Sequence, residues 1–181
     1  MKVNSCIEEV LITKKMIQAK CQALGKLITK DYQDKTPILV CLLKGGVPFL
    51  AELIKHIDCD IQIDFIDVAS YEGVSSSGKV KLIRDITTPV EGRHILLVDD
   101  IIDTGITLDE VIKIFKNRQA LSVETVTLVD KPEGRKIPNM QAKYIGYTIP
   151  NRFVVGFGLD YNELYRNLPY IGVLKKSVYE K

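Results

Sequence analysis

Two kinds of hydrophobic pattern alternate along the chain. Apolar residues at spacings of three, four and seven positions predict amphipathic helices, whereas short apolar or alternating runs bounded by turn residues predict strands. The helical pattern covers residues 7–30, 47–57 and 107–116. The strand pattern covers residues 38–43, 61–70, 80–86, 94–100, 123–130, 143–149, 153–158 and 171–176. Because helices and strands alternate early in the chain, we expect parallel βαβ units and an α/β fold.

Length, composition and charge narrow the class of protein. With 181 residues, 46% of them hydrophobic and 27% charged, we expect a single globular domain that buries a full core. The formal net charge of +2 argues against a dedicated nucleic-acid binder. The four cysteines form no CxxC pair, no apolar run approaches the roughly 18 residues of a membrane span, and the first residues lack a signal-peptide pattern. A cytoplasmic protein without a nucleic-acid or membrane partner is therefore expected.

The segment ILLVDDIIDTGITL, residues 95–108, carries the clearest chemical signal. A hydrophobic strand is followed by the adjacent acids Asp99 and Asp100, which repel each other and add nothing to packing. In open α/β sheets, ligands bind beyond the carboxyl ends of the strands. The two carboxylates are therefore predicted to hold ribose hydroxyls, directly or through Mg²⁺, a hard cation that prefers oxygen ligands.

Residues 103–107 follow as a turn into a helix. Free backbone N–H groups and the helix dipole favour a phosphate at such a position. Gly105 lets the backbone come close to a ligand, and Thr104 and Thr107 add hydroxyl donors. The alternative is a plain turn in which Asp103 caps the helix. Phosphorylated receiver domains also carry an acid pair at a strand end, but they require another acid after the first strand, where this chain has Lys44-Gly45-Gly46.

Residues 95–108 resemble the phosphoribosylpyrophosphate-binding signature of type I phosphoribosyltransferases, with Ile95 in place of the usual first Val and Asp99 in place of the usual first Glu. Other segments resemble the bacterial hypoxanthine-guanine branch of that family, over about residues 7–174. They are LLKGGVPFLAELI (42–54), SYEGVSSSG (70–78), LVDKPEGRK (128–136, with an extra-looking Gly134) and PNRFVVGFGLDYNELYRNLPYIGVL (150–174). The resemblance implies a mostly parallel sheet with helices on both faces, plus a small hood formed by the terminal segments.

The resemblance also implies an activity, which is Mg²⁺-dependent transfer of ribose 5-phosphate from phosphoribosylpyrophosphate to hypoxanthine or guanine, yielding IMP or GMP and pyrophosphate. Mg²⁺ and basic groups would neutralise the pyrophosphate. Lys44, in a turn whose Leu43–Lys44 peptide is expected to be cis, and Arg166 would serve there, although either residue alone could be a solvated surface charge. Asp99 and Asp100 would hold Mg²⁺, and Asp160 would hold a second Mg²⁺. The implied nucleotide-binding residues are Lys44, Gly45, Asp99, Asp100, Asp103, Thr104, Gly105, Ile106, Thr107 and Arg166.

A purine pocket is implied by the same resemblance. Phe153 would stack on the base, Lys131 would donate to the 6-oxo group, and Asp160 and the backbone of Val154 would complete the pocket. Without the resemblance, Phe153 would be a core residue and Lys131 a turn residue. Asp103 would act as the general base that accepts the proton from purine N7.

Residues 71–79, introduced by Ser70 and Tyr71, would form a lid that excludes water, although their Gly-Ser composition also suits a plain hairpin tip. A homodimer or homotetramer is the family habit. Two rival functions are a nucleotide-sensing regulator that binds RNA, which the near-neutral charge disfavours, and a related transferase for xanthine or a pyrimidine.

Overall fold

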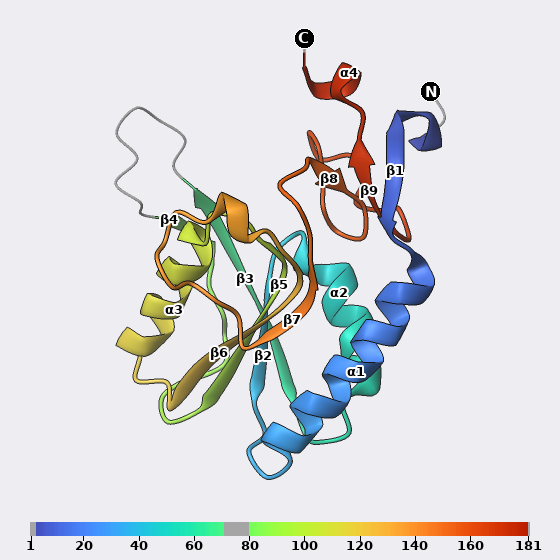
Figure 1. Ribbon diagram of the computed structural model, residues 1–181. Helices are drawn as coiled ribbons and strands as arrows, with labels where there is room; N and C mark the ends of the chain where they lie inside the picture. The colour runs from blue at the N-terminus through green and yellow to red at the C-terminus, as the bar shows by residue number, and fades with distance from the viewer. Residues whose placement is uncertain (1–2, 71–79, 181) are drawn as a thin grey trace.

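The structure is a computed structural model that describes residues 3–70 and 80–180. Its centre is a six-stranded sheet in the order β4-β3-β2-β5-β6-β7 (Figure 1). Each of the strands β3, β2, β5, β6 and β7 runs parallel to its neighbour, and only the edge strand β4 is antiparallel. The strands are β2 (Ile38–Leu42), β3 (Gln62–Ser70), β4 (Val80–Arg84), β5 (His94–Ile102), β6 (Ser122–Asp130) and β7 (Tyr144–Thr148). The mostly parallel sheet expected from the sequence is therefore confirmed.

Helices cover both faces of this sheet, as expected (Figure 1). Helices α1 (Lys14–Tyr32) and α2 (Gly46–Leu53), the latter continued by η2 (Ile54–His56), pack on one face, and α3 (Ile106–Asn117) packs on the other. Alternate residues of a strand point to opposite faces, so Leu39 and Cys41 of β2 join the core beneath α1 and α2. Their neighbours Ile38, Val40 and Leu42 join the core beneath α3. Burial on both faces explains why β2 is hydrophobic throughout.

A separate three-stranded antiparallel sheet, which we call the hood, lies beside the carboxyl edge of the main sheet (Figure 1). It has the order β1-β9-β8, with β1 (Ile7–Ile12), β8 (Val154–Val155) and β9 (Ile171–Leu174). The short elements η1 (Val3–Cys6) and α4 (Lys176–Tyr179) flank it, and η3 (Pro132–Gly134) follows β6. The hood therefore combines the first and last strands of the chain, as the resemblance implied.

The expected helix over residues 7–30 is wrong in its first part. Residues 7–12 form β1 and pair with β9, and α1 begins only at Lys14, where the Thr13 side chain accepts a hydrogen bond from the Met16 N–H. Several strands are shorter than expected, among them β4, which ends at Arg84, and β7, which covers Tyr144–Thr148. Residues 153–158 shrink to β8 because Gly156, Phe157 and Gly158 take positive φ, and the last strand ends at Leu174. In the described part of the chain, no helix is long and apolar enough to cross a membrane.

Candidate active site

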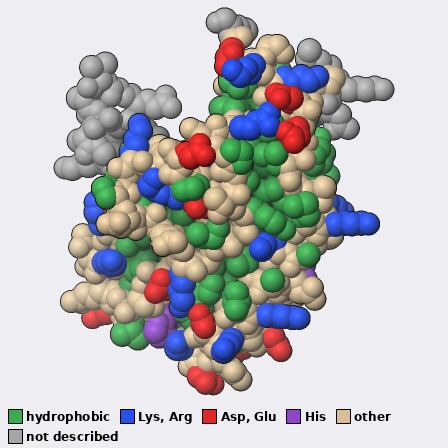
Figure 2. Space-filling model, viewed as in Figure 1, with side chains coloured by type: hydrophobic (Ala, Val, Ile, Leu, Met, Phe, Trp, Pro, Cys, Tyr) green, Lys and Arg blue, Asp and Glu red, His purple; other side chains and the backbone are tan. Residues whose placement is uncertain are grey.

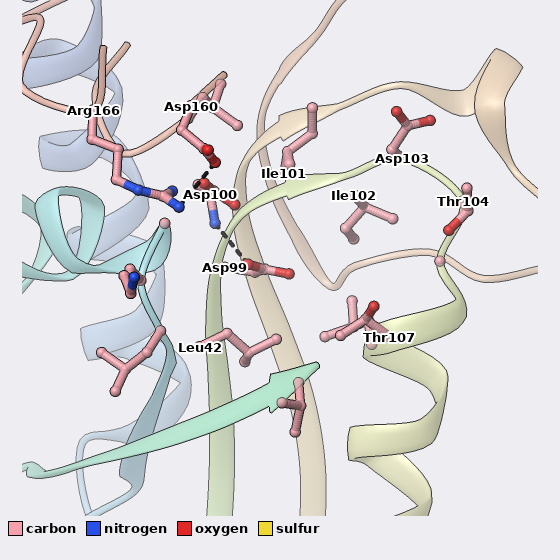
Figure 3. A pocket seen from close by; sticks show the side chains of 17 residues that line it. Leu42, Asp99, Asp100, Ile101, Ile102, Asp103, Thr104, Thr107, Asp160 and Arg166 are labelled. Carbon is pink, nitrogen blue, oxygen red and sulfur yellow. Dashed lines mark hydrogen bonds and ion pairs between the residues drawn. The ribbon is translucent and has the colours of Figure 1, made fainter. Parts of the chain in front are cut away.

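A cavity of about 370 Å³ opens where the carboxyl ends of β2 and β5 meet the N-terminal ends of α2 and α3. Figure 3 shows Arg166 and Asp160 reaching toward Asp100 from one side, with Asp103 and Thr104 on the other. This placement beyond the strand ends is the one that open α/β sheets use for ligands. The lining residues are Leu42, Leu43, Lys44, Gly45, Val68, Asp99, Asp100, Ile101, Ile102, Asp103, Thr104, Gly105, Thr107, Leu108, Leu159, Asp160 and Arg166.

Asp99 and Asp100 lie inside β5, which runs two residues further than the sequence predicted. The Asp100 N–H donates to Oδ1 of Asp99 at 3.0 Å, and Asp100 is only 8% exposed. Burial raises the pKa of both carboxyls, and the charge of Asp100 raises that of Asp99 further. One buried and one half-buried carboxylate, each with a raised pKa, form a pair of oxygen donors suited to a hard cation.

Gly45 allows the turn before α2 to approach this acid pair. A Cβ at this position would overlap the Asp100 carboxylate, so any other residue would push the turn away from the cavity. The Leu43–Lys44 peptide that leads into the turn is cis, as the resemblance implied. The backbone of this turn therefore lies directly against the cavity.

Basic groups line the wall of the cavity that lies opposite Asp103 and Thr104. The Arg166 Nη2 lies 2.9 Å from Asp160 Oδ1 and 3.1 Å from Glu163 Oε1, and its Nη1 donates to the Gly158 carbonyl at 2.7 Å. Its Nε is buried without a hydrogen-bond partner among the described residues. Lys44 pairs with Glu163 at 2.7 Å. Arg166 and Lys44 thus bring two positive charges to the cavity wall, where guanidinium and ammonium groups can bind an anion.

The turn into α3 has the features expected of a phosphate site. Gly105 takes φ of 81° and is the N-cap of α3, so no N-cap side chain occupies the first N–H groups of this helix. Asp103 is therefore not the cap, and that alternative is wrong. The N–H of Ile106 lies 3.4 Å from the Thr104 hydroxyl, and Thr107 lines the cavity. An anion placed here would meet backbone donors at the positive end of the helix dipole.

Asp103 is instead held by the loop that follows β6. The Lys131 Nζ lies 2.9 Å from Oδ2 of Asp103, and Lys131 is 7% exposed. Oδ1 of Asp103 fills the place that a Cβ would take on Gly134. Gly134, whose effect the sequence left open, is therefore the residue that lets this loop close on the carboxylate.

Arg135 was missed by sequence reasoning. Its Nη1 donates to the Asp103 carbonyl at 2.7 Å, and its Nη2 forms an ion pair with Asp130. Both residues are largely buried, so the pair ties the start of the phosphate turn to the end of β6. The only sequence signal was their position within the motif LVDKPEGRK. Glu163, the partner of Lys44 and Arg166, was likewise quoted within a motif but not singled out.

The residues expected at the purine are less closely grouped. Asp160 lines the cavity, and Lys131 contacts Asp103 at its edge. Val154 belongs to β8, and Phe153 precedes it with 39% of its surface exposed; neither lines the cavity.

The expected lid over residues 71–79 lies outside the described residues, as does the side chain of Ser70. No group of three or more metal-type side chains gathers within residues 3–70 and 80–180.

Comparison with known proteins agrees with this geometry. The family model of the phosphoribosyl transferase domain matches residues 7–162. The hypoxanthine-guanine phosphoribosyltransferase of Lactococcus lactis subsp. lactis (strain IL1403) is 55% identical over 180 residues, covering 99% of this chain and 97% of that protein. Its namesake from Bacillus subtilis (strain 168) is 53% identical over 175 residues, covering 96% and 97%. A crystal structure of a hypoxanthine phosphoribosyltransferase from Staphylococcus aureus has a TM-score of 0.96 at 47% identity, covering 100% of this chain and 98% of that one. Motifs, fold and comparisons together show that the chain belongs to the phosphoribosyl transferase family and has its type I fold.

Proposed function

We propose that this protein is a purine-salvage enzyme that transfers the 5-phosphoribosyl group from phosphoribosylpyrophosphate to hypoxanthine or guanine. The observation that carries the proposal is the convergence of three features on one cavity: the buried acid pair, the phosphate turn and the Arg166 guanidinium. A sugar with a phosphate at one end and a pyrophosphate at the other requires all three. The family membership and the names of the relatives support the same reaction.

The phosphoribosylpyrophosphate would lie across the cavity. Its 5-phosphate fits the turn of residues 103–107, where the N-terminus of α3 is open. Its ribose hydroxyls fit Asp99 and Asp100. Its pyrophosphate fits the opposite wall, where Lys44, the backbone of Gly45 and Arg166 would bind it.

Asp99, Asp100 and Asp160 do not gather into one ready-made metal site among the described residues, but their carboxylate oxygens are ligands that Mg²⁺ prefers, and Mg²⁺ is commonly held by one or two carboxylates together with substrate phosphates. When bound, Mg²⁺ would neutralise the pyrophosphate as it leaves. The chain's own part is to fix the sugar: β5 holds the two carboxylates rigidly, and the turn at Gly45 closes against them. Groups fixed in this way lower the activation barrier of the transfer because they hold the sugar in the reactive orientation.

In the transfer, a purine nitrogen forms a bond to the sugar carbon as the bond from that carbon to pyrophosphate breaks. The proton at purine N7 passes to Asp103, the general base. Lys131 donates to the 6-oxo group, Phe153 stacks on the ring and the Val154 backbone reads its edge. Because Lys131 pairs with Asp103 in the structure, it must turn from that carboxylate to the purine as the base binds.

A product assay tests this function. Purified protein is incubated with phosphoribosylpyrophosphate, Mg²⁺ and, separately, hypoxanthine, guanine, xanthine, adenine or uracil, and the nucleotide is identified by mass spectrometry. IMP or GMP with equimolar pyrophosphate is the expected result. Product only from xanthine or uracil would assign the chain to a related transferase, and no product from any base would overturn the proposal.

We also propose a cytoplasmic setting and a homodimer or homotetramer. The cytoplasm is supported by the four cysteines, none of which forms a disulfide within the described residues; Cys6, Cys21 and Cys41 are buried. The surface view in Figure 2 shows acidic and basic side chains interspersed on this face, without the single-sign patch that an RNA-binding regulator would need. Light scattering after size-exclusion chromatography tests the oligomeric state.

A further inference from the structure

Phe153 belongs to a cluster of three aromatic rings in the hood. Its ring is stacked with that of Tyr179, with centroids 4.8 Å apart and planes inclined by 24°. Tyr161 meets both rings edge-on, 5.7 Å from Phe153 and 6.4 Å from Tyr179. Offset stacking and edge-to-face contact are the two favourable arrangements of aromatic pairs, so the cluster fixes the Phe153 ring in one orientation.

Tyr179 belongs to the element of the hood that lies farthest from the main sheet. It lies in α4, which sits at the outer end of the hood, whereas the acid pair and Asp103 lie at the carboxyl edge of the sheet (Figure 1). Tyr161 follows Asp160, which lines the cavity, and touches Phe153 at an edge. One face of the Phe153 ring is thus covered by Tyr179, and 39% of the residue's surface remains exposed.

Helix α4 is fastened to the opposite end of the described chain. The Lys175 N–H donates to the Cys6 carbonyl at 2.9 Å, and the Lys175 Nζ donates to the Ser5 carbonyl at 2.7 Å. Val178 and Tyr179 pack against a buried cluster that includes Cys6 and Leu174. The position of the Tyr179 ring is therefore set by the hood itself.

The outer side of the stacked pair is hollow. A cavity of about 360 Å³ lies there, lined by Glu8, Asn151, Arg152, Phe153, Val173, Lys176, Tyr179 and Glu180. Tyr161 contacts Phe153 only at an edge, so among the described residues Tyr179 is the one ring stacked on Phe153.

We propose that Tyr179 is a positioning residue for the purine: it backs the Phe153 ring and holds it ready to stack on the base. The inference rests on the proposed role of Phe153. A ring already fixed in its binding orientation loses less freedom when the purine arrives, so the support from Tyr179 acts on purine affinity. It does not touch the sugar, the pyrophosphate or the reacting atoms.

Steady-state kinetics of four variants test this proposal. Tyr179→Ala is expected to raise KM for hypoxanthine and guanine by roughly two- to tenfold, the range of an aromatic pair contact, with kcat and the KM for phosphoribosylpyrophosphate changed by less than about twofold. Tyr179→Phe keeps the ring and is expected to restore the wild-type values. Phe153→Ala is expected to raise the same KM at least as much, and the double variant Phe153→Ala/Tyr179→Ala no further, because Tyr179 acts through Phe153.

Val178→Ala is the matched control, since it loosens the packing of α4 but leaves the ring in place. An equal rise in purine KM for Val178→Ala would overturn the positioning role in favour of general loosening. Unchanged kinetics for Tyr179→Ala, with Phe153→Ala impaired, would overturn it as well, as would a lowered KM, which would make Tyr179 a competitor for the purine. If Phe153→Ala itself has wild-type kinetics, the proposed role of Phe153 fails and this inference fails with it.

Discussion

The ammonium group of Lys131 lies 2.9 Å from Oδ2 of Asp103, so the two residues proposed to act on a purine begin paired with each other. The 6-oxo group and N7 lie on the same edge of the purine, and one base can therefore separate the pair and engage both side chains. Lys131 then gains an oxygen acceptor as Asp103 becomes free to accept a proton. A purine without a 6-oxo acceptor offers no replacement for the ion pair, which adds to the discrimination against it.

Removal of the lysine tests this exchange. Lys131→Ala is expected to lower kcat/KM for hypoxanthine and guanine by the equivalent of about 1–3 kcal/mol, because the 6-oxo group loses its hydrogen-bond donor. The exposed Lys136 on the same loop provides the control Lys136→Ala, which should retain wild-type kinetics. Unchanged kinetics for Lys131→Ala would reduce Lys131 to a turn residue.

Gly134→Ala is expected to disturb the ion pair between Lys131 and Asp103, because Gly134 lies against the Asp103 carboxylate. The added methyl group would overlap Oδ1 of Asp103 while Lys131 holds Oδ2, so the loop has to shift. kcat/KM is expected to fall by the equivalent of about 1–3 kcal/mol, the usual size of an overpacking effect. Little change in Tm is expected because the turn is at the surface. Glu133→Ala, an exposed change on the same turn, serves as the control. Wild-type kinetics for Gly134→Ala would show that the loop adapts freely.

Substitutions of Asp103 and Asp100 are expected to impair different steps of the reaction. Asp103→Asn keeps the shape of the side chain but cannot accept the N7 proton, so the chemical step should slow by about 10²-fold while substrates still bind. Asp100→Asn should instead weaken phosphoribosylpyrophosphate binding through the lost charge. Single-turnover kinetics separate the two effects. A wild-type rate for Asp103→Asn would assign the base to another group.

Metal removal is expected to abolish turnover. If Asp99, Asp100 and Asp160 act through Mg²⁺, EDTA should stop the transfer and excess Mg²⁺ should restore it. Calorimetric titration of Mg²⁺ in the presence of phosphoribosylpyrophosphate adds a readout that is independent of activity. Full activity after exhaustive chelation would contradict the assignment.

The lowered pKa of Asp64, a residue outside the active site, predicts that the stability of the protein depends on pH. Burial would raise the pKa of its carboxyl, but hydrogen bonds from Thr88, Phe65 and Thr87 outweigh burial and lower the pKa from 3.8 to about 2. A lowered folded-state pKa stabilises the protein above the unfolded value, and the stabilisation, about 2 kcal/mol, is lost as the pH falls from about 4 toward 2.

Urea unfolding of the wild type and Asp64→Asn at pH 7 and pH 3 measures this contribution. The variant should be less stable at pH 7, because an amide has only one acceptor oxygen for these donors, and its stability should fall less on acidification. Asp60→Asn, at an exposed position, should behave as the wild type does. Identical pH profiles for wild type and Asp64→Asn would rule out the stabilising role.

Periodicity predicted most of the main sheet because its central strands are buried on at least one face. It misassigned residues 7–12 because Ile7, Val10 and Leu11 fit a helix locally, whereas the strand depends on β9, which no local pattern reveals. Motifs located the phosphate turn and the acid pair, which are contiguous in sequence. They did not reveal that Asp103 fills the space beside Gly134 or that Tyr179 backs Phe153, since these contacts join distant segments.

The pairing of β1 with β9 has a consequence for biosynthesis. Residues 7–12 leave the ribosome early, but their partner strand, residues 171–174, is made only after the whole main sheet. Until then β1 remains an unpaired edge on the nascent chain, although the parallel sheet beside it can already fold. Asp160 and Arg166 lie between β8 and β9, so this late closure also delivers them to the cavity. The part of the cavity wall formed by Asp160 and Arg166 is therefore assembled last during translation.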